Sequence, residues 1–239
     1  MLNPLGLAYI PRIAFKSHQN EDAFEFFNMD TTNPHLKKQA FNNQIKLGLI
    51  MQERLKESGE YIGLALPLYN MKSDALKILV NRTNPDTPHY LIKCSLRHST
   101  LYRDSGYHTI GIHVDSNGKK YGQPPVITVI DSFGSPKEQE PKEIKKIREN
   151  FEKILKEVFP KAQINYTKEQ QQDFNTLYCA NWAWSNLESM AESGGDVSKL
   201  PKAEDLPKIL KHQMDIVKNY SPRRPFDSSF QDSWSILQA

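Results

Sequence analysis

Two short runs with the pattern of β-strands lie near the middle of the chain, and they constrain its fold most strongly. Residues 108–115 read His-Thr-Ile-Gly-Ile-His-Val-Asp, and residues 126–131 read Val-Ile-Thr-Val-Ile-Asp. In the first run isoleucine or valine recurs at every second position, which places the apolar side chains on one face of a strand. The run ends at Ser-Asn-Gly, and Asn-Gly between two β-rich runs favours a hairpin. We therefore predict two neighbouring antiparallel strands joined by a long loop.

Helical patterns surround these strands. Apolar residues recur at three- and four-residue spacings over 36–58, 141–159 and 206–218, and the stripe over 141–159 is the clearest. Shorter β-like segments are 61–68, 90–96 and 162–166, whereas residues 1–35 and the last twenty residues have an irregular pattern. This order of elements predicts an α+β fold with a small central sheet, mixed or antiparallel, flanked by helices.

A further helix is expected to begin close to one of the two cysteines. Asn175 or Thr176 is a suitable N-cap, which would place Cys179 in the first turn of a helix that runs to about Glu192. The pair of glycines at 194 and 195 is expected to end it.

Composition excludes several classes of protein. The chain has 239 residues, of which 38% are hydrophobic and 25% charged, and its net charge is only +3. These values are typical of a globular protein, and the apolar runs are too short to span a bilayer. No arginine-rich arm or aromatic RNA-binding signature is present, so we expect no nucleic-acid partner. The first residues lack a signal-peptide pattern, so we expect a cytoplasmic location or export by a signal-independent system into a host cytosol.

The surroundings of Cys179 suggest a nucleophile. A thiol near its ordinary pKa is only slightly ionised at neutral pH, and a helix N-terminus and a nearby histidine both favour the thiolate. His108 begins the first predicted strand and Asp131 ends the second, so antiparallel pairing would bring both to one edge of the sheet. Three glutamines, 170–172, precede the cysteine and offer an amide donor for an oxyanion.

These motifs and their order resemble clan CE cysteine peptidases, the group of the SUMO proteases and the adenovirus protease. The matching segments are 108–115, 129–134 (Val-Ile-Asp-Ser-Phe-Gly) and 170–182, within roughly residues 100–195. The chain departs from the family at Thr109, where an aromatic residue is usual, and at Tyr178-Cys179-Ala180, where Asp-Cys-Gly is usual.

The resemblance implies an α+β fold of this clan and a catalytic set of Cys179, His108, Asp131 and a glutamine. The glutamine of the family lies six positions before the cysteine, where this chain has Asp173. Gln172 is favoured as the oxyanion donor and Gln171 is the alternative. The implied reaction is cleavage of ubiquitin or a ubiquitin-like modifier from proteins, by a bacterial effector that acts as a monomer and needs no cofactor.

The same resemblance leaves two other functions open. Some bacterial effectors similar to this clan transfer acetyl from acetyl-CoA to Ser, Thr or Lys and are activated by inositol hexakisphosphate. Lys208, Lys211, Arg223 and Arg224 are candidates for the basic pocket that such an activator would need. The third function is that of an inactive module that binds a ubiquitin-like protein.

The domain organisation follows from the motifs. We expect an N-terminal region over 1–60 that contributes to substrate recognition. A catalytic α+β core would span 61–200, and a C-terminal helix with an irregular tail would pack on it over 201–239.

Each candidate residue also has a structural interpretation. Cys179 can be a core cysteine, since free cysteines are often buried, and we expect that role for Cys94. His113 lies on the same strand as His108 but on its opposite face, so only one of them can face Cys179. Asp131 can be a turn former, and so can Asp115 at the other strand end. The lysine-rich helix at 141–158 is expected to present a solvated face beside its apolar stripe, and two cysteines without a paired-histidine spacing give little support for a metal site.

Overall fold

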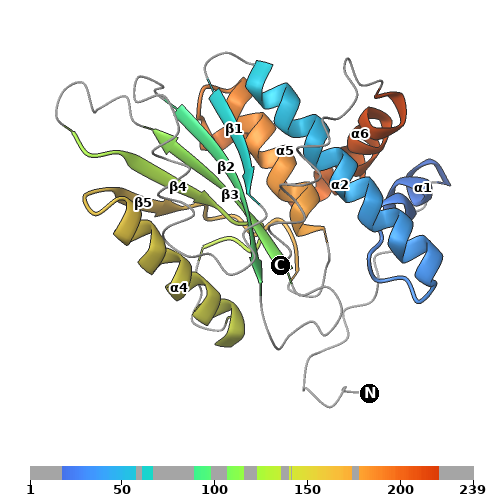
Figure 1. Ribbon diagram of the computed structural model, residues 1–239, viewed down its shortest axis with the longest axis horizontal. Helices are drawn as coiled ribbons and strands as arrows, with labels where there is room; N and C mark the ends of the chain where they lie inside the picture. The colour runs from blue at the N-terminus through green and yellow to red at the C-terminus, as the bar shows by residue number, and fades with distance from the viewer. Residues whose placement is uncertain are drawn as a thin grey trace, which may run out of the picture.

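The computed structural model describes residues 18–57, 61–66, 89–97, 107–115, 123–135, 140, 142–173 and 178–220. Figure 1 shows a central sheet with one helix on one face and the remaining helices on the other. The helices are α1 (His18–Phe26), α2 (Pro34–Glu57), α4 (Lys142–Val158), α5 (Cys179–Glu192) and α6 (Leu206–Asn219), with 3-10 turns at Val197–Lys199 and Ala203–Asp205. The strands are β1 (Tyr61–Leu66), β2 (His89–Arg97), β3 (Tyr107–Asp115), β4 (Val126–Ile130) and β5 (Gln163–Tyr166).

The five strands form one mixed sheet in the order β1-β2-β3-β4-β5. The central pairs β2–β3 and β3–β4 are antiparallel, and the outer pairs β1–β2 and β4–β5 are parallel. The predicted antiparallel pairing of 108–115 with 126–131 is therefore confirmed, with Gly111 opposite Ile130 and Asp115 opposite Val126. An α+β fold with a mixed sheet flanked by helices is likewise confirmed.

Apolar side chains project from both faces of the sheet, so each face has its own hydrophobic core. On the α4 face, side chains from β2, β3 and β4 pack against Phe151 and Leu155 of the helix. On the other face, Leu91 and Ile130 pack with residues of α1, α2, α5 and α6, among them Ala23, Leu47 and Trp184. Burial of this much apolar surface on both faces fixes the register of the central strands, because a slip by one residue would reverse every side chain.

Glycine is required where α5 crosses the sheet. A methyl group at Gly111 would lie 3.1 Å from Cδ2 of Leu187, so the missing side chain lets the helix lie close to β3. This close approach fixes the height of α5 above the strand that carries His108.

Most predicted elements agree with the structure, and two details were wrong. Residues 18–26, within the segment expected to be irregular, form α1; Ala23 of this helix and Phe27 directly after it are buried against the neighbouring helices. The N-cap of α5 is Tyr178 and not Asn175 or Thr176, and its side chain makes no capping hydrogen bond. The predicted first turn at Cys179 and the stop at Gly194 and Gly195, both with positive φ, are confirmed.

None of the helices among the described residues combines the length and apolar character that a membrane-spanning helix needs. The segments 1–17 and 221–239, which include Arg223 and Arg224, lie outside the described residues.

Candidate active site

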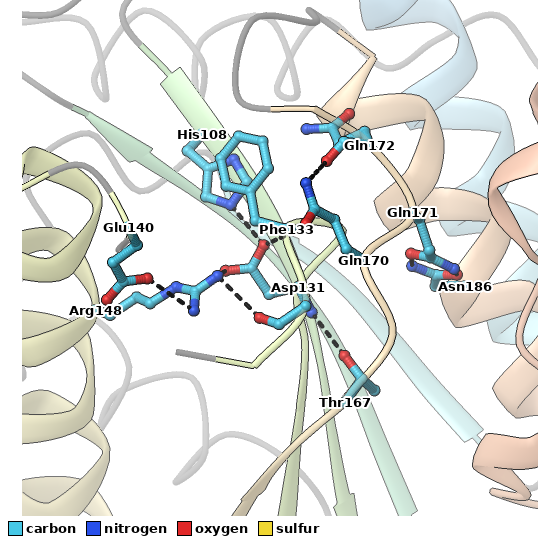
Figure 2. Close-up of polar contacts among 11 residues, drawn as sticks. His108, Asp131, Phe133, Glu140, Arg148, Thr167, Gln170, Gln171, Gln172 and Asn186 are labelled. Atoms are coloured by element: carbon cyan, nitrogen blue, oxygen red, sulfur yellow. Dashed lines mark hydrogen bonds and ion pairs between the residues drawn. The ribbon is translucent and has the colours of Figure 1, made fainter. Parts of the chain in front are cut away.

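His108 and Asp131 meet at one edge of the sheet. His108 lies at the start of β3 and Asp131 directly follows β4, and these two ends coincide because the strands are antiparallel. Nε2 of His108 lies 2.9 Å from Oδ1 of Asp131, and both side chains are almost fully buried (Figure 2). The predicted neighbourhood of these two residues is therefore present in the structure.

The carboxylate of Asp131 is held at both oxygens. Oδ1 accepts the backbone N–H of Phe133 at 2.9 Å in addition to His108, and Oδ2 lies 3.0 Å from Nη2 of Arg148. Burial alone would raise the pKa of Asp131, but the charges of His108 and Arg148 and these hydrogen bonds outweigh it and lower the pKa. Asp131 is thus an anion with a fixed orientation.

The ring of Phe133 fixes the plane of the imidazole. The Phe133 and His108 rings are stacked with their centroids 4.2 Å apart and their planes at 8°. Phe133 is placed there by a tight turn, in which the Gly134 N–H donates to the Asp131 carbonyl at 2.8 Å. Gly134 has φ 77°, and a side chain on it would press against the backbone of 168–170.

Cys179, the first residue of α5, shares a side-chain hydrogen bond with His108. Because Nε2 is engaged by Asp131, Nδ1 is the nitrogen left to face the sulfur. Burial alone would raise the pKa of Cys179. The hydrogen bond and charge of His108, together with hydrogen bonds from Thr109, outweigh burial and lower the pKa. The first turn of a helix also favours a thiolate.

The pKa of His108 moves in the opposite direction. Burial alone would lower it, but the carboxylate of Asp131 and the thiolate of Cys179 raise it to about 9. The arrangement therefore favours an imidazolium–thiolate ion pair at neutral pH, which is the reactive form of a cysteine nucleophile. Lys93 adds a second positive charge to the surroundings of the sulfur, although burial lowers its own pKa to about 8.

The two candidate glutamines have different surroundings. The side chain of Gln171 forms a reciprocal amide pair with Asn186, at 2.8 and 2.7 Å, and donates to the Pro201 carbonyl at 2.6 Å. Gln172 is also buried, but neither its Nε2 nor its Oε1 has a hydrogen-bond partner in the part of the chain that the structure describes. Of the two candidates, Gln172 is thus the one whose amide donor has no partner among the described residues.

The glutamine segment itself is anchored to the strand that ends at Asp131. The backbone N–H groups of Gln171 and Gln172 both donate to the Ser132 carbonyl, at 2.8 and 3.0 Å. Nε2 of Gln170 donates to the Gln172 carbonyl at 2.9 Å (Figure 2). This anchoring ties the segment that carries Gln172 to the turn that directly follows Asp131.

The other candidates lie away from this cluster. Cys94 is buried in the core under α4, and burial raises its pKa to about 12, which makes it inert. His113 is 3.1 Å from His89, and burial, followed by the charge of His89, lowers its pKa to about 4. Asp115 lies at the same end of the sheet, 3.8 Å from His89. In the described ranges, no three His, Cys, Asp or Glu side chains are arranged as metal ligands would be.

No family model and no curated protein matches the chain. Similar proteins are found among the solved structures. The central domain of the uncharacterized Lpg1148 protein from Legionella pneumophila is 13% identical, with a TM-score of 0.42, over 82% of this chain and 96% of that one. A de-sumoylating protease is 15% identical, with a TM-score of 0.39, over 92% and 85%. HopZ1a in complex with IP6 and CoA is 9% identical, with a TM-score of 0.47, over 82% and 53%. Similarity at this level does not extend to chemistry, which follows only from the chain's own residues.

Arg148 is a buried residue of the site that the sequence analysis missed. The helix at 141–158 was expected to carry its charges on a solvated face, but Arg148 is 5% exposed and reaches Asp131. A signal was present, because Arg148 falls within the apolar stripe, four residues after Ile144 and three before Phe151. A charge inside an apolar stripe indicates a buried partner.

Proposed function

We propose that the chain is a cysteine isopeptidase that releases ubiquitin or a ubiquitin-like modifier from proteins. The observation that carries the proposal is the chain of contacts from Asp131 through His108 to Cys179 at a helix start. A thiolate paired with an imidazolium, which is in turn oriented by a buried carboxylate, suits nucleophilic acyl transfer. The substrate class follows from the resemblance of the three sequence motifs to clan CE peptidases.

Each residue has a defined task in this reaction. The Cys179 thiolate attacks the carbonyl carbon of the isopeptide bond, and the carbonyl oxygen becomes an oxyanion. Nε2 of Gln172 and the backbone N–H of Cys179 stabilise that oxyanion. His108 then protonates the leaving lysine amine, which leaves a thioester on Cys179. A water molecule, deprotonated by His108, hydrolyses the thioester and restores the thiol.

Further features of the proposal rest on the sequence and on its resemblance to clan CE peptidases, and not on the geometry of the site. The protein would act as a bacterial effector in a host cytosol, as a monomer, without a cofactor and without a nucleic-acid partner. Residues 1–60 would contribute to substrate recognition.

The proposal is tested by offering the protein two kinds of acyl donor. Purified chain is incubated with isopeptide-linked conjugates of ubiquitin, SUMO and other ubiquitin-like proteins, and separately with labelled acetyl-CoA with and without inositol hexakisphosphate. Release of a modifier by the wild type, but not by Cys179→Ala, supports the isopeptidase. Self-acetylation that depends on Cys179 would replace the proposal with an acetyltransferase. Binding of a modifier without turnover would replace it with an inactive module.

The pH dependence of kcat/KM is expected to be bell-shaped. Because the pKa of Cys179 is lowered, the acid limb should lie below the ordinary pKa of a thiol. Because the pKa of His108 is raised to about 9, the imidazolium that protonates the leaving amine is lost as the pH rises through that value. Initial rates measured between pH 5 and pH 10.5, roughly the span of the two limbs, would show both. A rate that continues to rise through pH 9 would be the behaviour of an unpaired thiol.

A further inference from the structure

Arg148 forms a buried bridge between helix α4 and the proposed triad. Its Nη2 lies 3.0 Å from Oδ2 of Asp131 and donates to the Gly134 carbonyl at 2.9 Å. On the other side, Nη1 lies 3.1 Å from Oε2 of Glu140, an ion-pair contact without the alignment of a hydrogen bond. Figure 2 shows the resulting row of side chains, from Glu140 through Arg148 and Asp131 to His108.

We propose that Arg148 is a positioning residue for catalysis, which holds Asp131 ionised and correctly rotated so that His108 remains an imidazolium beside the Cys179 thiolate. The inference rests on the proposed nucleophilic role of Cys179. It adds a fourth charged residue, from a helix on the opposite face of the sheet from Cys179, to the machinery of the site.

The geometry separates this role from simple anchoring of α4. An arginine that only tied the helix to the sheet could use the Gly134 carbonyl and Glu140. Here the same Nη2 also contacts the one carboxylate oxygen of Asp131 that His108 leaves free. The two oxygens of Asp131 therefore have different partners, and the carboxylate cannot rotate without losing one of them. A planar guanidinium can make these several directed contacts at once, whereas an ammonium group is a compact point charge.

The electrostatic consequence has a definite sign. A buried carboxylate without a cation is protonated more readily, and a protonated Asp131 no longer stabilises a charge on His108. A neutral His108 in turn withdraws its stabilisation from the thiolate. Loss of the Arg148 charge should therefore reduce the thiolate fraction of Cys179 at mildly acidic pH, through Asp131 and His108.

The test measures the rate of alkylation of Cys179 by iodoacetamide as a function of pH, on the full chain and with Cys179→Ser as the blank. Arg148→Gln removes the charge and is expected to lower the rate at pH 6 by about tenfold. Arg148→Lys restores the charge without the fork and should recover part of that rate. Glu140→Gln is the matched control. It neutralises a charge in the same buried row but keeps the contact between the Arg148 guanidinium and Asp131. Its rate at pH 6 should be unchanged or higher.

A lower rate in Arg148→Gln together with an unchanged or higher rate in Glu140→Gln supports the inference. An Arg148→Gln variant that melts earlier but has an unchanged alkylation profile would overturn it and leave Arg148 as an anchor of α4. Equal losses in Arg148→Gln and Glu140→Gln would also overturn it, since that is the result of general disruption. If Arg148→Gln does not fold, Arg148→Lys decides, with an expected loss of about threefold at pH 6 and refutation by an unchanged rate.

Failure of this inference is distinguishable from failure of the proposed function. Iodoacetamide reacts with any thiolate and needs no modifier. If the alkylation rates change as expected but no conjugate is cleaved, the role of Arg148 is supported and the proposed substrate class is wrong. If the protein cleaves conjugates but the alkylation profile of Arg148→Gln is unchanged, the proposed function is supported and the role of Arg148 is wrong.

Discussion

Replacement of Gln172 by alanine is expected to lower kcat by about 10²–10³-fold, the usual effect of removing one oxyanion donor. The same substitution should leave the alkylation rate of Cys179 unchanged, because displacement of iodide forms no oxyanion. Thermal stability should be unchanged or higher, since both polar atoms of the Gln172 amide are buried without a partner among the described residues. Steady-state kinetics, alkylation and a melting curve on one variant check all three expectations.

Gln171→Ala is the matched control for this experiment. It removes an amide that pairs with the buried Asn186 side chain and with the partly buried Pro201 carbonyl, and the unsatisfied Asn186 amide should cost roughly 1–3 kcal/mol in the free energy of unfolding. The control should therefore melt earlier and keep most of its kcat. A larger loss of kcat in Gln171→Ala than in Gln172→Ala, with both proteins folded, would mean that Gln171 and not Gln172 is the oxyanion donor.

Replacement of His108 by alanine is expected to lower kcat/KM by at least about 10²–10⁴-fold, the range for loss of a general acid–base group. The physical reason is twofold, because the variant loses the proton carrier and also the cation that holds Cys179 ionised. Alkylation of Cys179 at pH 6 should fall as well, which separates this variant from Gln172→Ala. The measurement is kcat/KM on the conjugate that the wild type cleaves, together with the alkylation rate.

His113→Ala is the matched control, a second histidine on the same strand with its side chain on the other face. His113 contacts His89 and Gly195, near the opposite end of β3 from His108. Its loss should therefore affect stability and change kcat/KM by no more than about twofold. Equal catalytic losses in the two histidine variants would mean that the fold, and not the ion pair, determines the rate.

The elements with a strong local signal were predictable from the sequence. The alternation of apolar residues at 110, 112 and 114 fixed one face of β3, and the structure buries that face against α4. The end of α5 at two glycines was predictable because glycine with positive φ is a local signal of a helix end, whereas the predicted N-cap, Asn175 or Thr176, was wrong. The proximity of His108 to Asp131 followed from strand pairing alone.

The features that depend on distant contacts were not predictable. Helix α1 is nine residues long, and it is stabilised by burial of Ala23 and Phe27 against helices that follow much later in the chain. The difference between Gln171 and Gln172 depends on Asn186 and Pro201, which lie 15 and 30 residues further along the chain. No local pattern contains that information. The sequence therefore pointed to the segment Gln-Gln-Gln without separating Gln171 from Gln172.

Arg148 is the intermediate case. Its position in the apolar stripe of α4 was visible in the sequence, but the identity of its partner was not. The structure pairs it with Asp131 and with Glu140, both of which precede the helix. A charged residue on an apolar stripe thus indicates a buried ion pair without specifying it.

The central claim is that Cys179 is the nucleophile for the carbonyl at the end of a ubiquitin-like modifier. The most direct measurement is the reaction of the full chain with ubiquitin, SUMO and other ubiquitin-like proteins that carry a C-terminal electrophile, followed by intact mass and peptide mapping. We predict a one-to-one covalent adduct with at least one modifier, located on Cys179 and absent in Cys179→Ala, with Cys94 unmodified. No adduct with any modifier, or an adduct that persists in Cys179→Ala, would contradict the account.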